Sequence, residues 1–127
     1  GSSQSVTVRV NPTPALNSTL TPPAICSNTA FTYTPTSLTA GATFTWTRAA
    51  VAGISNAAIT AAQSTNPNEV LINTTANPID VVYRFITTAN GCSSTAQDVT
   101  VRVNPTPTLS STLTPPAICS NTAFTYT

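Results

Sequence analysis

Apolar and polar residues alternate with a period of two along several short segments of the chain. In Val6–Val10 valine alternates with threonine and arginine, and in residues 43–47 phenylalanine and tryptophan alternate with threonine. Because successive side chains of a strand point to opposite faces of its sheet, these segments indicate strands with one buried face. We expect strands at residues 6–10, 16–20 (an edge strand), 31–34, 43–47, 69–73, 79–88 and 98–103.

Turn signals separate these segments at intervals of about 8–12 residues. Asn66-Pro67-Asn68 and Ala76-Asn77-Pro78 are typical of turns, and Asn90-Gly91 is typical of the primed turn of a two-residue hairpin. The Ala-rich stretch 48–63 lacks a helical period, and its glycine favours short strands or a loop. The pattern predicts an all-β fold, an antiparallel β-sandwich.

One face of the predicted strands should supply a single hydrophobic core. Trp46 shares its face with Phe44, which favours a buried indole over an exposed platform for sugar stacking. Asp80 and Arg84 fall in the register that faces solvent. Glu69 and Asp98 are also expected on solvated strand faces. The residues that we expect in the core are Phe31, Tyr33, Phe44, Trp46, Val81, Tyr83, Phe85, Val101 and Val103.

The chain also repeats itself. Residues 6–34 and 99–127 are identical except at two positions, where Ala15 and Asn17 correspond to Thr108 and Ser110. The offset is 99 − 6 = 93 residues, close to the length of one β-sandwich domain. We therefore predict a tandem array with a 93-residue period. Residues 1–11 would be the final strand of a preceding repeat, 12–104 one complete repeat, and 105–127 the opening strands of the next; residues 1–3 also resemble a cloning scar.

A proline-rich segment follows the repeated Val-Thr-Val-Arg-Val strand at both places. Two prolines fix φ, remove two donors and bias their neighbours to extended backbone, so each segment predicts a short, stiff joint between repeats. The joint residues are Asn11, Pro12 and Pro14 and, one period later, Asn104, Pro105 and Pro107.

Composition excludes several classes of function. Charged residues make up 6% of the chain, there is no histidine, and the net charge of +1 offers no basic surface for nucleic acid or anionic lipid. No apolar run is long enough to span a membrane. Without an imidazole there is no Ser-His pair, and three well-separated acids make no calcium loop. We expect no enzyme activity, no catalytic residue, no metal site and no cofactor.

Short motifs spread over the whole period resemble the PKD-like, immunoglobulin-type repeats of large surface proteins in gliding and environmental Bacteroidota. They are Ile25-Cys26-Ser27, Phe31–Pro35, Phe44–Arg48, Val51–Ser55, Asn90-Gly91-Cys92 and Val101–Pro105. The resemblance implies an immunoglobulin-like sandwich, export through the type IX secretion route and a cell-surface or extracellular location. The chain departs from the better-known PKD pattern because Thr47-Arg48, and no acidic Gly-Asp-Gly turn, follows the core tryptophan.

Each period holds two cysteines, Cys26 and Cys92, and Cys119 repeats Cys26. In an extracellular repeat a disulfide is the natural interpretation. We favour a Cys26–Cys92 bond inside one repeat, which leaves Cys119 without its partner in this segment. The alternative is a bond between repeats, because the two positions usually lie at opposite ends of an immunoglobulin-type sandwich.

These observations predict a structural repeat module of a long secreted adhesin or extracellular filament, acting as a stalk or spacer. Its partners would be neighbouring identical repeats in the same chain or fibre, and a surface glycan or cell-surface ligand is not identified by the sequence. Two alternatives stay open. One is a filament subunit that exchanges strands with its neighbours, and the other is a carbohydrate-binding accessory module with an exposed aromatic platform.

Overall fold

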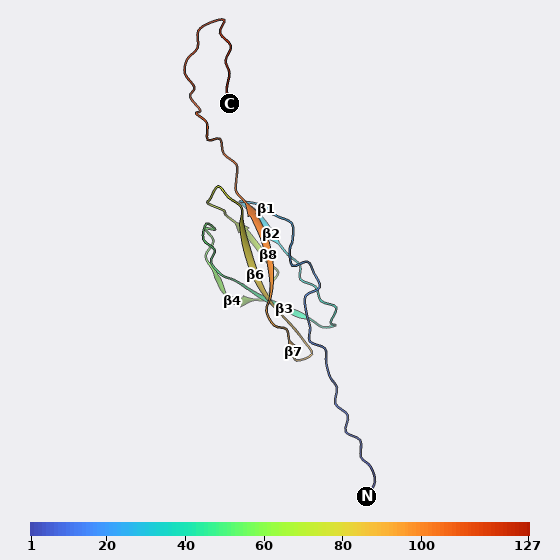
Figure 1. The fold of residues 1–127 in the computed structure, drawn as a ribbon. Helices are drawn as coiled ribbons and strands as arrows, with labels where there is room; N and C mark the ends of the chain where they lie inside the picture. Colours follow the sequence, from blue (N-terminus) through green and yellow to red (C-terminus); the bar gives the residue numbers. More distant parts are fainter.

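Eight strands and their connections account for the central part of the chain in the computed structural model, which describes all residues 1–127 (Figure 1). The strands are β1 (Ile25–Cys26), β2 (Thr29–Thr32), β3 (Thr43–Arg48), β4 (Ile59–Gln63), β5 (Asn68–Leu71), β6 (Ile79–Ala89), β7 (Cys92–Ser93) and β8 (Gln97–Asn104). One sheet has the order β1-β8-β6-β3-β4, with β7 also paired to β6, and the second sheet is β2-β5. The prediction of an all-β fold is confirmed.

The hairpin between β6 and β7 is the turn that the sequence indicates. Asn90 and Gly91 have φ values of 51° and 77°, and Ala89 pairs directly with Cys92. Positive φ at both central residues defines a type I′ turn, which matches the twist of the flanking strands. The long strand β6 then pairs with β8 over Ile79–Phe85 and with β3 over Tyr83–Thr88.

One strand pair departs from the antiparallel arrangement. β1 runs parallel to β8, so that Ile25 is paired with Val103 and Cys26 with Asn104. Ser27 extends this pairing, because its N–H donates to the carbonyl oxygen of Asn104 at 2.8 Å. Residues 25–27 are therefore held against the end of β8.

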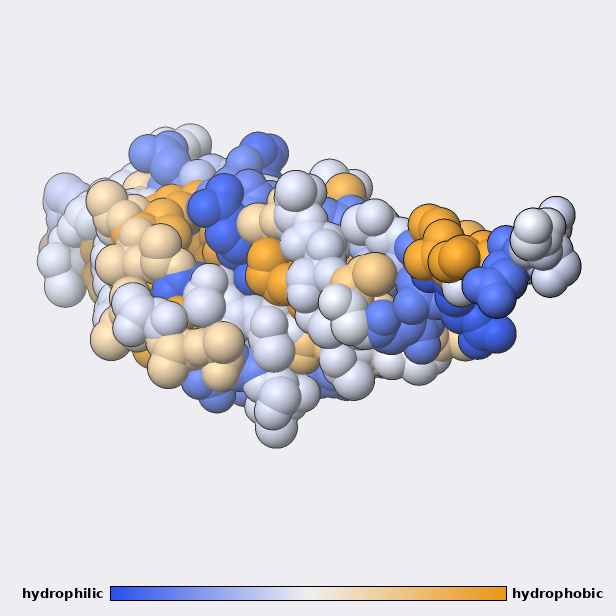
Figure 2. All heavy atoms as spheres, turned by 90° about the horizontal axis from the view of Figure 1, so that it is seen from below, coloured by the Kyte–Doolittle hydropathy of each residue, from blue (hydrophilic) through white to orange (hydrophobic).

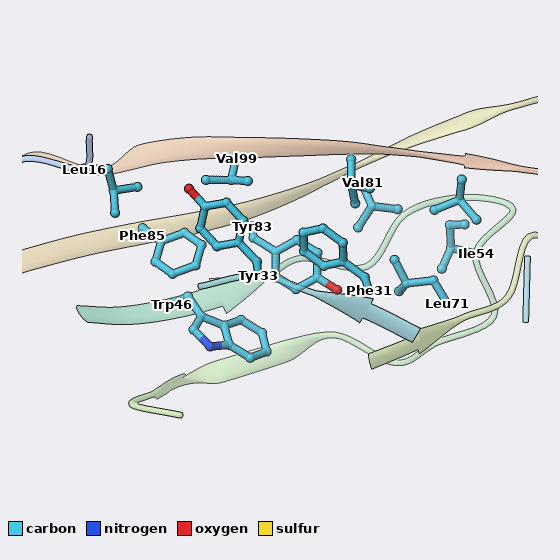
Figure 3. Packing of buried hydrophobic residues seen from close by; sticks show 12 residues of the cluster. Leu16, Phe31, Tyr33, Trp46, Ile54, Leu71, Val81, Tyr83, Phe85 and Val99 are labelled. Carbon is cyan, nitrogen blue, oxygen red and sulfur yellow. The ribbon is translucent and has the colours of Figure 1, made fainter. Parts of the chain in front are cut away.

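The core lies between the two sheets (Figure 3). Phe31 of β2 packs against Tyr83 of β6 with ring centroids 4.8 Å apart, and Trp46 of β3 meets the same tyrosine edge-on at 5.2 Å. The polar groups of both rings are hydrogen-bonded: the Trp46 indole N–H donates to the Thr65 carbonyl oxygen at 2.7 Å, and the Tyr83 hydroxyl donates to Glu69 Oε2 at 2.7 Å. All predicted core residues are buried except Phe44, which is half-buried at the edge of the cluster. The sequence-based core omitted Leu16, Ile54, Leu71 and Val99.

The two ends of the chain leave the sandwich in opposite directions (Figure 1). Residues 1–11 and 105–127 form no strand, so Val6–Val10 is unpaired here. The predicted edge strand 16–20 is not a strand either, but it is bonded to β8 at both ends, by Leu16 N–H to the Gln97 side-chain oxygen and by Thr100 N–H to the Leu20 carbonyl oxygen. Seen from the N-terminal end, apolar surface lies open beside hydrophilic side chains (Figure 2). The structure contains no helix that is long and apolar enough to cross a membrane.

Candidate inter-repeat junction

At the end where the chain enters the sandwich, the first proline joint is fixed to the β6–β7 hairpin. The side-chain amide of Asn11 donates to the Asn90 carbonyl oxygen at 3.1 Å. Pro14 is buried, and the N–H of Leu16 donates to the side-chain oxygen of Gln97 at 2.8 Å. Of the predicted joint residues, Asn11 and Pro14 thus lie against the sandwich on the side of the hairpin turn, while Pro12 is exposed.

At the opposite end, where the chain leaves, Asn73 organises the second joint. Its side-chain amide donates to the carbonyl oxygens of Val103 at 2.9 Å and Asn77 at 2.7 Å, and its side-chain oxygen accepts from the Thr75 N–H at 2.8 Å. Ser27 completes the cluster through its hydroxyl, which accepts from the Asn73 N–H at 2.9 Å. These bonds fix the end of β8 just before Pro105.

A groove of about 570 Å³ opens beside this second joint. One wall is the turn between β5 and β6 and the other is the start of the C-terminal segment. Its lining is polar except for a single alanine and two prolines, and consists of Asn73, Thr74, Thr75, Ala76, Pro105, Thr106, Pro107 and Thr108.

The C-terminal segment keeps the local conformation of the segment that it repeats. Tyr126 bonds through its hydroxyl to the Ser111 hydroxyl at 2.7 Å, as Tyr33 does to Ser18 at 2.7 Å. Phe124 stacks on Tyr126 with ring centroids 6.2 Å apart, the same separation as between the equivalent aromatic rings of the first copy. The asparagines before the two copies of the aromatic segment, Asn28 and Asn121, also share a positive φ, 66° and 62°. Residues 105–127 and 12–34 therefore share local structure as well as sequence.

The preferred disulfide of the sequence analysis is wrong. Cys26, Cys92 and Cys119 are all free thiols. Cys26 lies beside Asn104, where β6 begins at Ile79, whereas Cys92 is paired with Ala89 at the other end of the same strand. At about 3.3 Å per residue, the length of β6 separates them by roughly 30 Å, far beyond disulfide reach. The cause is the parallel β1–β8 pair, which holds Cys26 at the exit end.

Between the sheets lies a charged cluster that the sequence analysis missed. The Arg48 guanidinium, 1% exposed, donates through Nε and Nη2 to the two Glu69 carboxylate oxygens at 2.7 and 2.8 Å. Its Nη2 also donates to the Ala57 carbonyl oxygen at 2.6 Å, and the Tyr83 hydroxyl donates to Glu69 Oε2 at 2.7 Å. The expectation of a solvated Glu69 is thus wrong, because its register faces the core.

These contacts fix the ionisation of the cluster. Burial by itself would raise the pKa of Glu69, but the hydrogen bonds from Arg48 and Tyr83 outweigh it and hold that pKa below its ordinary value. The hydrogen bond to Glu69 raises the pKa of Arg48. Burial, and next the bond to Glu69, raise the pKa of the Tyr83 hydroxyl, which stays a donor. The cluster ties β3, β5 and β6 together across the two sheets.

Other charged residues lie where the pattern puts them. Asp80 pairs with Arg102 at 2.9 Å and Asp98 with Arg84 at 3.1 Å, all on exposed strand faces. The hydrogen bond from Arg102 lowers the pKa of Asp80. No group of three or more His, Cys, Asp or Glu side chains converges on a point that could hold a metal ion. The sandwich itself presents no exposed aromatic platform, since only Phe44 among its rings is even half exposed.

Comparison with known proteins adds one finding. The family model of the PKD-like domain matches residues 23–107, which is two thirds of the chain and spans β1 to β8. No curated protein and no solved structure matches the chain at a significant level.

Proposed function

The chain belongs to the PKD-like domain family, and from this premise we propose that it is a structural repeat module of a long secreted adhesin or extracellular filament, acting as a stalk or spacer. Residues 12–104 would be one complete immunoglobulin-like repeat of a tandem array. Residues 1–11 and 105–127 would be parts of the neighbouring repeats. The mechanism is mechanical, without catalysis and without a cofactor.

The observation that carries this proposal is the position of the two joints. Asn11 and Asn104 are equivalent residues one period apart, and they lie at opposite ends of the sandwich. Each period therefore advances the chain by one domain length. β6 alone has 11 residues, which at about 3.3 Å per residue span about 35 Å, so a repeat with its joint gives an axial step of about 40 Å.

The hydrogen bonds next to β8 suit a load-bearing module. The opening segment enters at one end and lies alongside β8, which leaves at the other end, and the bonds Thr100 N–H···O=C Leu20 and Ser27 N–H···O=C Asn104 connect them. Tension between the two joints acts along the strands and therefore across these bonds. The bonds are loaded together and do not open one after another.

The composition of the chain and its family assignment suit the same role outside the cell. No lysine and four arginines leave few sites for trypsin-like proteases outside the cell. An extracellular location is supported by the family assignment, and the neighbouring repeats are the partners that the joints imply.

The test uses a two-repeat chain, in which a second copy of residues 35–104 follows Thr127 and completes the second repeat. Small-angle X-ray scattering and electron microscopy should find a rod. Its maximum dimension should exceed that of a chain of residues 1–104 by about 40 Å. Stretching single molecules under reducing conditions should give two unfolding events, each releasing about 280 Å of chain. Two repeats folded back side by side would contradict the spacer function.

One observation favours a second candidate, a filament subunit that exchanges strands. The tail 105–127 already has the local conformation of 12–34, so it could take the place of these residues in another molecule at little energetic difference. Such a head-to-tail exchange propagates unless it closes. Under this candidate the 127-residue chain forms filaments that deletion of residues 105–127 abolishes; a monodisperse monomer would exclude it. The carbohydrate-binding alternative needs an exposed aromatic platform, which the sandwich does not present; the exposed Phe124 and Tyr126 repeat the core residues Phe31 and Tyr33 and would be buried in a completed repeat.

A further inference from the structure

The cysteines lie at the two joints, and the inference drawn from this rests on the proposed tandem array. Cys26 is exposed and directly opposite Asn104 in the β1–β8 pair. Its neighbour Ile25, opposite Val103, packs against the core. Because side chains alternate along a strand, Cys26 and Asn104 project from the outer face of the sheet, side by side. The thiol thus belongs to the exit end of its repeat.

The entry end holds the equivalent of Asn104 against the hairpin that carries the other cysteine. Asn11 corresponds to Asn104 one period earlier, and its side-chain amide donates to the Asn90 carbonyl oxygen at 3.1 Å. Cys92 follows Asn90 by two residues, as the first residue after the type I′ turn. Its side chain is half-buried at this end of the sandwich.

Combining the two ends brings both thiols to one joint. In an array, Asn104 of one repeat also takes the place of Asn11 for the next repeat. It is therefore paired with Cys26 of its own repeat and contacts the Asn90-Gly91 hairpin of the next repeat. Neighbouring strands are about 4.8 Å apart, and a disulfide needs Cα atoms about 4.4–6.8 Å apart. We propose that a disulfide joins Cys26 of one repeat to Cys92 of the next repeat in the array.

The groove beside the exit joint fits this arrangement. It is about 570 Å³, lies between the β5–β6 turn and Pro105–Thr108, and flanks the same asparagine position. The hairpin of the next repeat is its occupant. Every internal joint of the array then carries one covalent bridge, and Cys119, the equivalent of Cys26, serves the joint that follows.

The oxidation is a two-electron step. Two S–H bonds break and one S–S bond forms, and the two thiols lose two protons and two electrons. A small-molecule or protein disulfide takes them up and becomes two thiols, as in ordinary thiol–disulfide exchange outside the cytosol. The bridge closes the joint without altering any contact inside either sandwich.

The two-repeat chain tests this directly. It is oxidised with glutathione disulfide, the remaining thiols are alkylated, and the peptides are mapped by mass spectrometry without reduction. We expect one bond, from Cys26 to the second copy of Cys92, with the first Cys92 and Cys119 alkylated. Cys26→Ser should abolish the bond, whereas the matched variant Cys119→Ser should leave it unchanged.

Two other outcomes overturn the inference: four alkylated thiols, or any bond other than this one. Scattering from the same sample separates this failure from failure of the spacer function. A rod of the expected length with four free thiols rejects only the bridge, while two repeats folded back side by side reject the spacer function whatever the thiols do.

Discussion

Two copies of nearly the same segment, residues 12–34 and 105–127, adopt the same local conformation and opposite degrees of burial. The tyrosine–serine bond, the aromatic stacking and the positive-φ asparagine occur in both. Yet Phe31 is 2% exposed and its equivalent Phe124 is 57% exposed. The segment therefore sets its own turns and hydrogen bonds, while burial comes from strands that are distant in sequence.

The two Val-Thr-Val-Arg-Val segments, residues 6–10 and 99–103, show the same dependence on distant strands. Val101 in β8 is completely buried and is paired with Val81 of β6, whereas its equivalent Val8 is 80% exposed in a segment without partners. A Val-Thr-Val-Arg-Val sequence is suited to a half-buried strand, but the ladder exists only where β6 and β1 supply it. Soluble proteins avoid long exposed apolar edges of this kind, which supports completion of both flanks by neighbouring repeats.

The largest expected effect is a difference in the free energy of unfolding between variants of Phe31 and of Phe124. Phe31→Ala removes a ring from the centre of the core and should lower the free energy of unfolding by about 3–5 kcal/mol. The matched variant Phe124→Ala should leave it unchanged in the 127-residue chain. Urea unfolding followed by Trp46 fluorescence measures both; equal effects of the two variants would refute the contrast.

The charged cluster of Arg48, Glu69 and Tyr83 gives the next largest effect. Residues 105–127 have no such cluster, because no β5 lies beside them. Glu69→Gln leaves the buried Arg48 without its counter-charge and should cost about 2–3 kcal/mol at pH 7. Asp98→Asn, which opens only an exposed pair, is the control and should change little.

The same variant should alter the response to acid. The folded-state pKa of Glu69 lies below its ordinary value, so its contribution to stability is complete above about pH 4.3 and is lost as the pH falls through the folded-state pKa. Unfolding measured between pH 7 and pH 2 should therefore show a shallower loss of stability for Glu69→Gln than for the unaltered chain. Parallel profiles would contradict the assigned role.

A smaller effect is expected at the tyrosines. Tyr33→Phe removes a hydroxyl that donates to the Thr19 carbonyl oxygen at 2.8 Å in a part-buried site, and should cost about 1 kcal/mol. Tyr126→Phe removes the equivalent bond in the exposed copy and should not change the unfolding midpoint. Thermal unfolding by calorimetry resolves a difference of this size. A destabilised Tyr126→Phe chain would mean that the tail already packs on the sandwich.

Much of the fold follows from local pattern. Period-two alternation located the long strands, and Asn90-Gly91 located the hairpin, because both depend on residues close in sequence. If the alternation of residues 43–47 is continued to residue 48, Arg48 lies on the same face as Phe44 and Trp46. In the strand that begins at residue 69, Glu69 lies on the same face as Leu71. Opposite charges at inward positions on two strands were thus a signal for the buried pair. Nothing local predicts the parallel β1–β8 pair, and the cysteine assignment failed for that reason.

The central claim is that residues 105–127 are the beginning of a further repeat, and amide hydrogen exchange tests it most directly. In the 127-residue chain the amides of residues 122–126 should exchange rapidly, while those of residues 29–33 are protected by β5 and its neighbours. In the two-repeat chain the account predicts that residues 122–126 acquire the protection of residues 29–33. Exchange at residues 122–126 that stays rapid after the second copy of residues 35–104 is added would contradict it.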